Sequence, residues 1–373
     1  MSQDEHRFDA DLQRSSRDRE MVRQGLQRAL AVQVPNGTEH EVGEVSGTSA
    51  TGMSSETLLF DAAWTEGGER HTERLVARVA PDTNDVPVFP TYDLPGQFAT
   101  IRTVSEMTDV PVPSTWWCEE GTKLIGSPFF VMGRVEGEVP SDVPPYNFGE
   151  GWLFTAAEEQ QRRLQDSTVA VLAELHAIPD PAQRFPHLVG PFPGDTALRR
   201  HVANRAHWYE WAARDSGRSK LLDRAFTWLE DRWPQHESPS VFCWGDSRIG
   251  NVMYRDFEPV AVLDWEMAGL GPCETDLAWM GYLHQMFEQM AQTYGFPNMP
   301  HFLRLEDLAT TYERLSGHAP RDLDWYFTYS AIQLGIVYLR TGMRSVHFGE
   351  REAPSDPDEL LMNADVIAEL IGA

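Results

Sequence analysis

The chain has 373 residues, with 31 Lys and Arg against 57 Asp and Glu, which gives a formal net charge of −26. Proteins that bind nucleic acid present basic surfaces to the phosphates, so this charge excludes nucleic acid as the expected partner. The chain is 41% hydrophobic and contains 12 Trp, 18 Phe and 10 Tyr, enough for a large core, which excludes disorder of the whole chain. The three cysteines have no metal-ligand spacing.

Neither a membrane span nor a secretory signal is expected. No stretch of about 18 apolar residues occurs in the sequence. Residues 1–20 are charged throughout and lack the apolar segment of a signal peptide. We therefore expect a cytoplasmic protein; nothing in the sequence indicates its oligomeric state.

In chain order, the apolar pattern predicts one helix, then strands, then mostly helices. Residues 17–34 have helical spacing, and Pro35-Asn36-Gly37 ends that helix. Strands are predicted at 57–64, 74–80, 115–118 and 129–132, with one helix at 94–107. Further helices are predicted at 158–178, 221–233, 276–294 and 323–343, with a strand-rich stretch at 241–265.

This order predicts an α+β molecule with two lobes and a cleft between them. The expected divisions are an N-terminal extension with a helix (1–37), a small antiparallel sheet (38–133) and a larger helical part (134–373).

The most informative stretch is 241–266. Asp246 is followed by Asn251, by a predicted hairpin, and by an apolar strand that ends in Asp264. A four-residue turn at 256–259 would place Asn251 opposite Asp264, with Cβ atoms about 4.5–5.5 Å apart. Such an oxygen pair suits Mg²⁺, which also binds phosphate and water oxygens. Asp246 would orient or deprotonate a hydroxyl.

Structural roles compete with this interpretation. In so acidic a chain, Asp264 and Glu266 alone are weak evidence, and an Asx turn would explain Asp246. The whole arrangement of Asp, Asn, hairpin and second Asp favours chemistry.

These residues resemble a known family. The segment 244–251 (Trp-Gly-Asp-Ser-Arg-Ile-Gly-Asn) is followed by Val-Leu-Asp-Trp-Glu at 262–266, by Gly269 and Gly271, and by Asp-Leu-Ala at 276–278. It is similar to the His-Gly-Asp-x-x-x-x-Asn and Ile-Asp-Trp/Phe-Glu patterns of the aminoglycoside phosphotransferase family. The resemblance extends from about residue 40 to the end of the chain. It is closest to a branch of bacterial phosphotransferases similar to kinase domains fused to acyl-CoA dehydrogenases.

The resemblance implies a bilobal protein-kinase-like fold, with a small antiparallel β N-lobe that binds the nucleotide and a larger helical C-lobe. It also implies that Asp246 is the catalytic base and that Asn251 and Asp264 are the magnesium ligands. Asp276 resembles an aspartate that holds the catalytic loop, although a plain N-cap would explain it equally well.

The resemblance also bears on two other residues of the loop that carries Asp246, namely Arg248 and Trp244. Arg248 stands two residues after Asp246, where protein kinases carry a lysine that touches the γ-phosphate; a surface arginine is the alternative. Trp244 replaces the usual histidine of the family, which removes a hydrogen bond that normally stiffens the loop.

The resemblance is looser in the N-terminal part. The loop 47–55, with Ser49, Gly52 and Ser54, resembles the hairpin that covers nucleotide phosphates, although such loops are usually plain turns. The segment 129–137 resembles the hinge, whose backbone would bind adenine from Met132 to Arg134. An ordinary buried strand with an exit turn is the alternative.

Two positions depart from the family pattern. Arg78 replaces the lysine of the third strand and would hold the α/β-phosphates with a bidentate fork. The helix glutamate that usually pairs with that lysine is missing, and Gln97 would substitute for it through hydrogen bonds alone.

The implied function is transfer of the γ-phosphoryl group of ATP, with Mg²⁺, to a hydroxyl of a small molecule, either aminoglycoside-like or another metabolite. A nucleotide-binding pseudokinase is the alternative: the missing helix glutamate favours it, and the presence of Asp246, Asn251 and Asp264 opposes it. A metal-dependent hydrolase using Asp264 and Glu266 is disfavoured, because no histidine or further carboxylate cluster accompanies them. The acidic charge would attract a polycation, but solubility explains it as well.

Overall fold

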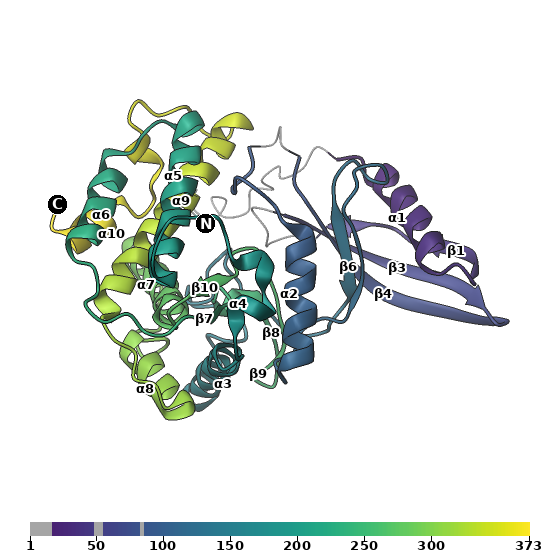
Figure 1. The fold of residues 1–373 in the computed structure, drawn as a ribbon, viewed down its shortest axis with the longest axis horizontal. Helices are drawn as coiled ribbons and strands as arrows, with labels where there is room; N and C mark the ends of the chain where they lie inside the picture. Colours follow the sequence, from purple (N-terminus) through teal and green to yellow (C-terminus); the bar gives the residue numbers. More distant parts are fainter. Residues whose placement is uncertain (1–16, 48–54, 83–85) are drawn as a thin grey trace. The chain divides into compact units, whose positions relative to one another are not determined.

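The structure is a computed structural model that describes residues 17–47, 55–82 and 86–373. The chain separates into two compact units (Figure 1). The first falls within Met1–Arg102 and Pro113–Glu136, and the second comprises Thr103–Val112 and Gly137–Ala373. Among the described residues, no helix is both long enough and apolar enough to cross a membrane.

The first unit is built on an antiparallel sheet. Its strands are β1 (Thr38–Val42), β2 (Ser46–Gly47), β3 (Glu56–Glu66), β4 (Glu69–Val79), β5 (Thr115–Glu119) and β6 (Phe129–Gly133). Their order is β1-β3-β4-β6-β5, and β2 also pairs with β3. The four strands expected from the sequence are therefore confirmed as β3, β4, β5 and β6.

Helix α1 (Arg19–Gln33) belongs to the core of this unit. On β3, the buried positions Leu58, Phe60 and Ala62 alternate with more exposed ones, as a strand with one covered face requires. They share one apolar cluster with Leu26 and Leu30 of α1, so the helix covers that face of the sheet (Figure 1). The expected helix at 17–34 is confirmed.

Helix α2 (Leu94–Met107) has the bounds expected from the sequence. Its first part belongs to the first unit, where the ring of Phe98 lies 5.9 Å from that of Phe130 on β6.

The second unit is mainly helical. Its helices are α3 (Glu158–His176), α4 (Pro181–Arg184), α5 (Ala197–Ser216), α6 (Lys220–Asp231), α7 (Glu274–Tyr294), α8 (Leu305–Ser316), α9 (Leu323–His347) and α10 (Ala364–Ile371), with short 3-10 helices at Pro186–Leu188, Ile249–Asn251 and Pro357–Leu360. Helix α9 packs against α5 and α7, and α3 packs against α8. The expected α3, α6, α7 and α9 are confirmed.

Helices α5, α8 and α10 were not predicted from the sequence. In α5, the buried face carries His201 and Arg205 beside Leu198, Val202 and Trp208, and these polar residues interrupt the apolar period.

Two short antiparallel sheets of two strands each belong to this unit. Strand β7 (Val241–Cys243) pairs with β10 (Gly269–Gly271), and β8 (Val252–Arg255) pairs with β9 (Glu258–Val262). The expected register of the second pair is wrong. Its turn has two residues, Asp256 and Phe257, both at positive φ, a form that suits the twist of paired strands.

A bulge between Met253 and Tyr254 also shifts the pairing, so that Val252 lies opposite Val262. The amide of Leu263, and not of Asp264, therefore donates to the carbonyl of Asn251 (2.8 Å). Asp264 follows at φ 58°, where the chain leaves the strand.

Candidate active site

The loop between β7 and β8 is held by the buried carboxylate of Asp276, in the first turn of α7. Its Oδ2 accepts from the amide of Trp244 (2.7 Å) and its Oδ1 from that of Gly245 (2.8 Å). The hydroxyl of Ser247 donates to the Asp276 carbonyl (2.7 Å). The N-cap of α7 is Cys273, so the N-cap interpretation of Asp276 is wrong, and its expected role in holding the loop is confirmed.

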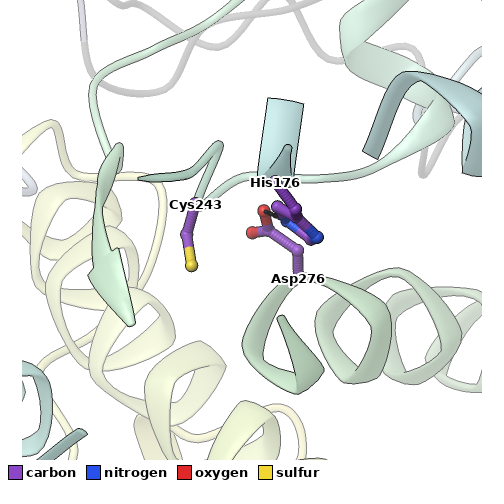
Figure 2. Close-up of side chains that lie close together, drawn as sticks. All are labelled: His176, Cys243 and Asp276. Carbon is purple, nitrogen blue, oxygen red and sulfur yellow. Dashed lines mark hydrogen bonds and ion pairs between the residues drawn. The ribbon is translucent and has the colours of Figure 1, made fainter. Parts of the chain in front are cut away.

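A histidine completes this arrangement. At the end of α3, Nε2 of His176 lies 3.1 Å from Oδ2 of Asp276, and Nδ1 lies 2.9 Å from the hydroxyl of Tyr312. Figure 2 shows His176 against Asp276, with Cys243 beside them. Burial raises the pKa of the Cys243 thiol well above its usual value. We interpret His176 and Asp276 as a hydrogen-bonded support and not as metal ligands, because a metal would need the Cys243 thiolate, and this thiol donates to the carbonyls of Gly271 (3.5 Å) and Pro272 (3.6 Å).

Gly245 allows the loop to approach the segment after Asp264. Its φ is 89°, and a Cβ there would lie 2.1 Å from the carbonyl oxygen of Met267. The indole Nε1 of Trp244 donates to the carbonyls of Leu263 (3.0 Å) and Asp264 (3.2 Å). Although Trp244 replaces the histidine of the family, the loop is thus fastened to the Asp264 segment by a different hydrogen bond.

Asp246 is oriented by three donors. Its Oδ1 accepts from the indole of Trp279 (2.8 Å), and its Oδ2 accepts from Nδ2 of Asn251 (2.6 Å) and from Nε of Arg248 (3.2 Å). A carboxylate offers about four lone-pair sites, so one site remains for a further donor. A substrate hydroxyl is such a donor.

Arg248 lies between two carboxylates. Its Nη1 forms an ion pair with Asp142, and its Nε forms one with Asp246. Burial acts to lower the pKa of Arg248, but Asp142, Asp246 and, more weakly, Asp264 outweigh it and raise that pKa. The alternative of a plain surface arginine is therefore wrong, because the side chain is 24% exposed and paired.

Asp142 reaches Arg248 because its segment is attached to β8. The amide of Glu138 donates to the carbonyl of Tyr254 (2.9 Å), and the amide of Tyr254 donates to the carbonyl of Glu138 (2.8 Å). Gly250 leaves room for the pair, since a Cβ there would lie 2.7 Å from both Nη1 of Arg248 and Oδ1 of Asp142.

The two residues expected to bind Mg²⁺ flank this cluster. The side-chain nitrogen Nδ2 of Asn251 donates to Asp246, while Oδ1 of Asn251 accepts no hydrogen bond from the described residues. Asp264 contributes to the raised pKa of Arg248, which places its charge in the same surroundings. One amide oxygen and one carboxylate form a donor set that fits Mg²⁺.

The site residues expected in the first unit are only partly described. Ser49, Gly52 and Ser54 lie outside the described residues. Arg78, on β4, is 8% exposed, and its Nη1 donates to the hydroxyl of Thr57 (2.7 Å). No hydrogen bond joins Gln97 to Arg78 in the described part of the chain, so the substitution expected of Gln97 is wrong.

In the expected hinge, two backbone amides already donate hydrogen bonds to carbonyls within the protein. Met132 lies within β6, and the amides of Gly133 and Arg134 donate to the carbonyls of Ser114 (2.8 Å) and Arg74 (2.9 Å). An adenine base would therefore have to use other backbone groups of this segment.

Sequence reasoning missed Trp279, Asp142 and His176. Trp279 stands three residues after Asp276 on α7 and thus shares its helix face, a spacing that would have indicated it. The separation between Asp142 and Arg248 along the chain carries no comparable signal.

Comparisons with known proteins bear on this geometry. The model of the phosphotransferase enzyme family (APH) matches residues 60–316. Human acyl-CoA dehydrogenase family member 11 is 24% identical over 245 residues, which cover 63% of this chain and 29% of the relative. The chain thus spans less than a third of that relative's length.

Solved structures share the fold. A Ralstonia eutropha protein assigned to the aminoglycoside phosphotransferases has a TM-score of 0.63 at 20% identity and covers 92% of this chain and 96% of its own. A thermostable mutant of aminoglycoside phosphotransferase APH(4)-Ia, in complex with ADP and hygromycin B, has a TM-score of 0.54 at 16% identity, covering 93% and 98%. The expected α+β, protein-kinase-like fold is confirmed.

Proposed function

Because the chain belongs to the phosphotransferase enzyme family, we propose that it transfers the γ-phosphoryl group of ATP, with Mg²⁺, to a hydroxyl of a small molecule. The observation that carries this proposal is the carboxylate of Asp246, which three side chains orient and which keeps one acceptor site.

In the proposed reaction, Asp246 accepts the hydrogen bond of the acceptor hydroxyl and takes its proton as the oxygen bonds to phosphorus. Trp279 and Asn251 donate to different oxygens of the carboxylate, so they fix its plane. A fixed carboxylate is valuable here because phosphoryl transfer depends mainly on positioning and charge stabilisation.

Arg248 supplies positive charge beside that carboxylate. Its raised pKa keeps the guanidinium charged, and its bonds to Asp142 and Asp246 hold it in place. We assign it to the oxygens of the transferring phosphoryl group, where a preorganised cation stabilises the charge that develops.

Asn251 Oδ1 and the Asp264 carboxylate would hold Mg²⁺. When bound, the ion would neutralise charge on the phosphate oxygens. In the first unit, Arg78 would bind the α/β-phosphates, the loop with Ser49, Gly52 and Ser54 would cover them, and the backbone near Met132 and Arg134 would contact adenine.

The acceptor belongs to the hydroxyl-bearing small molecules on which this family acts. Two similar proteins suggest two classes of acceptor to assay. APH(4)-Ia was solved with hygromycin B, and the human relative is an acyl-CoA dehydrogenase family member, so aminoglycosides and hydroxyacyl thioesters come first.

The test is ADP release from Mg²⁺-ATP in the presence of aminoglycosides, macrolides, hydroxyacyl thioesters and sugars. For the acceptor that responds, we expect Asp246→Asn to lower kcat by about 10²–10⁴-fold, because the general base is lost while the shape remains. Asp256→Asn, in the β8–β9 turn, serves as the matched control and should retain wild-type activity.

Turnover that survives in Asp246→Asn would contradict the assignment of the base. Nucleotide binding without phosphorylation of any compound would instead favour the pseudokinase, which the lack of a bond between Arg78 and Gln97 supports.

A further inference from the structure

A pocket of about 330 Å³ lies within the second unit, and none of the residues assigned to phosphoryl transfer lines it. It is lined by the first half of α5, by the segment Ala268–Leu270 that enters β10, and by the chain that follows α3. Helix α5 packs against β10, so the pocket has rigid elements on two sides.

Arg205 is a buried cation at this pocket, only 8% exposed. Its Nε donates to Oε1 of Gln333 (2.8 Å) and its Nη2 to the carbonyl of Met267 (3.4 Å). Within the described ranges, neither a carboxylate nor an acceptor for Nη1 contacts it. A buried charge without a counter-ion is costly, so an anion at the pocket would remove an unfavourable contribution.

His201 provides a second, independent observation. It lines the same pocket, is 7% exposed, and its Nδ1 lies 2.7 Å from the hydroxyl of Tyr329. Its Nε2 is buried and has no hydrogen-bond partner in the part of the chain that the structure describes. Burial and the neighbouring Arg205 lower the pKa of His201 well below its usual value, so the ring is neutral. A neutral imidazole nitrogen without a partner is a further unsatisfied group at this wall.

The charges around the pocket select a monoanion. Arg200 and Arg205 contribute two positive charges and Asp180 one negative charge, which leaves one positive charge to be balanced. The rest of the wall includes the apolar side chains of Leu188, Val189, Phe192 and Leu270. At about 30 Å³ for each water-sized group, the volume holds about ten non-hydrogen atoms.

We propose that this pocket binds the carboxylate of a small organic acid with an apolar chain of about four to eight carbons. The carboxylate pairs with Nη1 of Arg205, and the chain lies against the apolar wall. A carboxylate fits better than a phosphate dianion because only one positive charge is unbalanced.

The first experiment uses the unmodified protein without nucleotide. Calorimetry and thermal denaturation are measured with butanoate, hexanoate and octanoate, and with hexanamide, hexylamine and inorganic phosphate. We expect the acids to bind, more tightly as the chain lengthens within the pocket, and to raise Tm. The amide and the amine should bind at least tenfold more weakly than hexanoate.

The second experiment uses variants of Arg205. Arg205→Met should weaken hexanoate binding at least tenfold. Its Tm without ligand should stay close to that of wild type, because removal of the unpaired charge offsets the loss of the hydrogen bonds to Gln333 and Met267. Arg205→Lys should retain part of the affinity. Arg214→Met, an exposed arginine on the same helix and outside the pocket, should bind hexanoate like wild type.

Equal binding of hexanoate and hexanamide, or hexanoate affinity unchanged in Arg205→Met, would overturn the proposal. Phosphate binding tighter than hexanoate binding would overturn the assignment to a carboxylate. If Arg205→Met fails to fold, two measurements still test the proposal. They are the comparison of hexanoate with hexanamide in the wild-type protein and the hexanoate affinity of Arg205→Lys. These measurements involve no phosphoryl transfer, so their outcome does not depend on whether the proposed function is correct.

Discussion

Two arginines of the second unit, the half-buried Arg248 and the buried Arg205, have opposite surroundings. Arg248 lies between Asp142 and Asp246, and these carboxylates raise its pKa against the effect of burial. Arg205 has only neutral acceptors among the described residues, and burial lowers its pKa. The catalytic loop therefore balances its charge within the protein, whereas the pocket on α5 leaves a positive charge unbalanced.

The difference indicates what each region does. A charge that the protein itself balances is held in one position, as a group that acts on a reacting phosphate must be. An unbalanced charge indicates either that a bound ligand supplies the counter-ion or that the unpaired charge lowers the stability of the folded protein. Substitutions distinguish the two regions, because they affect stability to different degrees.

The largest effect is expected at Asp276, which balances no arginine but holds the loop. Asp276→Ala leaves the amides of Trp244 and Gly245 and the ring of His176 without their acceptor. We expect unfolding free energy to fall by about 3–5 kcal/mol, measured by urea denaturation. Asp365→Ala, in the first turn of α10, is the control and should change it by less than about 0.5 kcal/mol. A similar loss in both variants would show that Asp276 has no special role.

The direct comparison is between Arg248→Met and Arg205→Met. The first leaves two carboxylates close together without their cation and should destabilise the protein by about 1–3 kcal/mol. The second removes an unbalanced charge, which offsets the loss of its hydrogen bonds to Gln333 and Met267, and should therefore cost less than about 1 kcal/mol. Urea denaturation at one pH measures both. If the two losses are equal, the contrast in charge balance has no energetic consequence.

Substitution of Arg248 should also change the kinetic constants of phosphoryl transfer. We expect Arg248→Ala to lower kcat by about 10–100-fold while the KM for ATP changes little, because the cation acts on charge that develops in the transition state. Arg248→Lys should recover part of kcat. A rise in the KM for ATP alone would make Arg248 a ground-state contact, and a kcat within about twofold of wild type would make it structural.

A further effect, which depends on pH, concerns the buried histidine His284. Burial lowers its pKa to about 4, and the ring lies 2.7 Å from the hydroxyl of Tyr146, 3.2 Å from the carbonyl of Met299 and 3.7 Å from Glu288. Between about 4 and 6.5 the unfolded chain binds a proton that the folded protein does not. The contribution of His284 to stability is therefore complete above pH 6.5 and falls by about 1.4 kcal/mol for each pH unit between about 6.5 and 4.

Urea denaturation from pH 4.5 to 7 measures this slope. His284→Gln should reduce the slope, and His236→Gln, at an exposed position, should leave it unchanged. A slope that is identical in all three proteins would assign the pH dependence to other groups.

Much of the fold followed from periodicity. The apolar spacing of α2 and the alternation on β3 were sufficient, because in both cases one face is buried and the other is not. Helix α5 was missed because its buried face carries His201 and Arg205. The β8–β9 register was missed because a two-residue turn and a bulge replace the four-residue turn, and no simple pattern distinguishes these.

The site divides in the same way. The spacing from Asp246 to Asn251 is local, so the sequence alone placed both residues on one loop, but it paired Asn251 with Asp264 and did not indicate that Nδ2 of Asn251 donates to Asp246 (2.6 Å). The contacts of Asp246 with Trp279 and of Arg248 with Asp142 join segments far apart in the chain.

By itself, the sequence determined the family, the local elements and the loop that carries Asp246, because these depend on residues close together in the chain. Only the tertiary structure decided that Asp276 and His176 hold that loop, that Asp142 balances Arg248, and that Arg205 has no counter-ion among the described residues. The physical reason is that charge balance and hydrogen-bond satisfaction depend on which distant segments meet, and periodicity carries no information about such encounters.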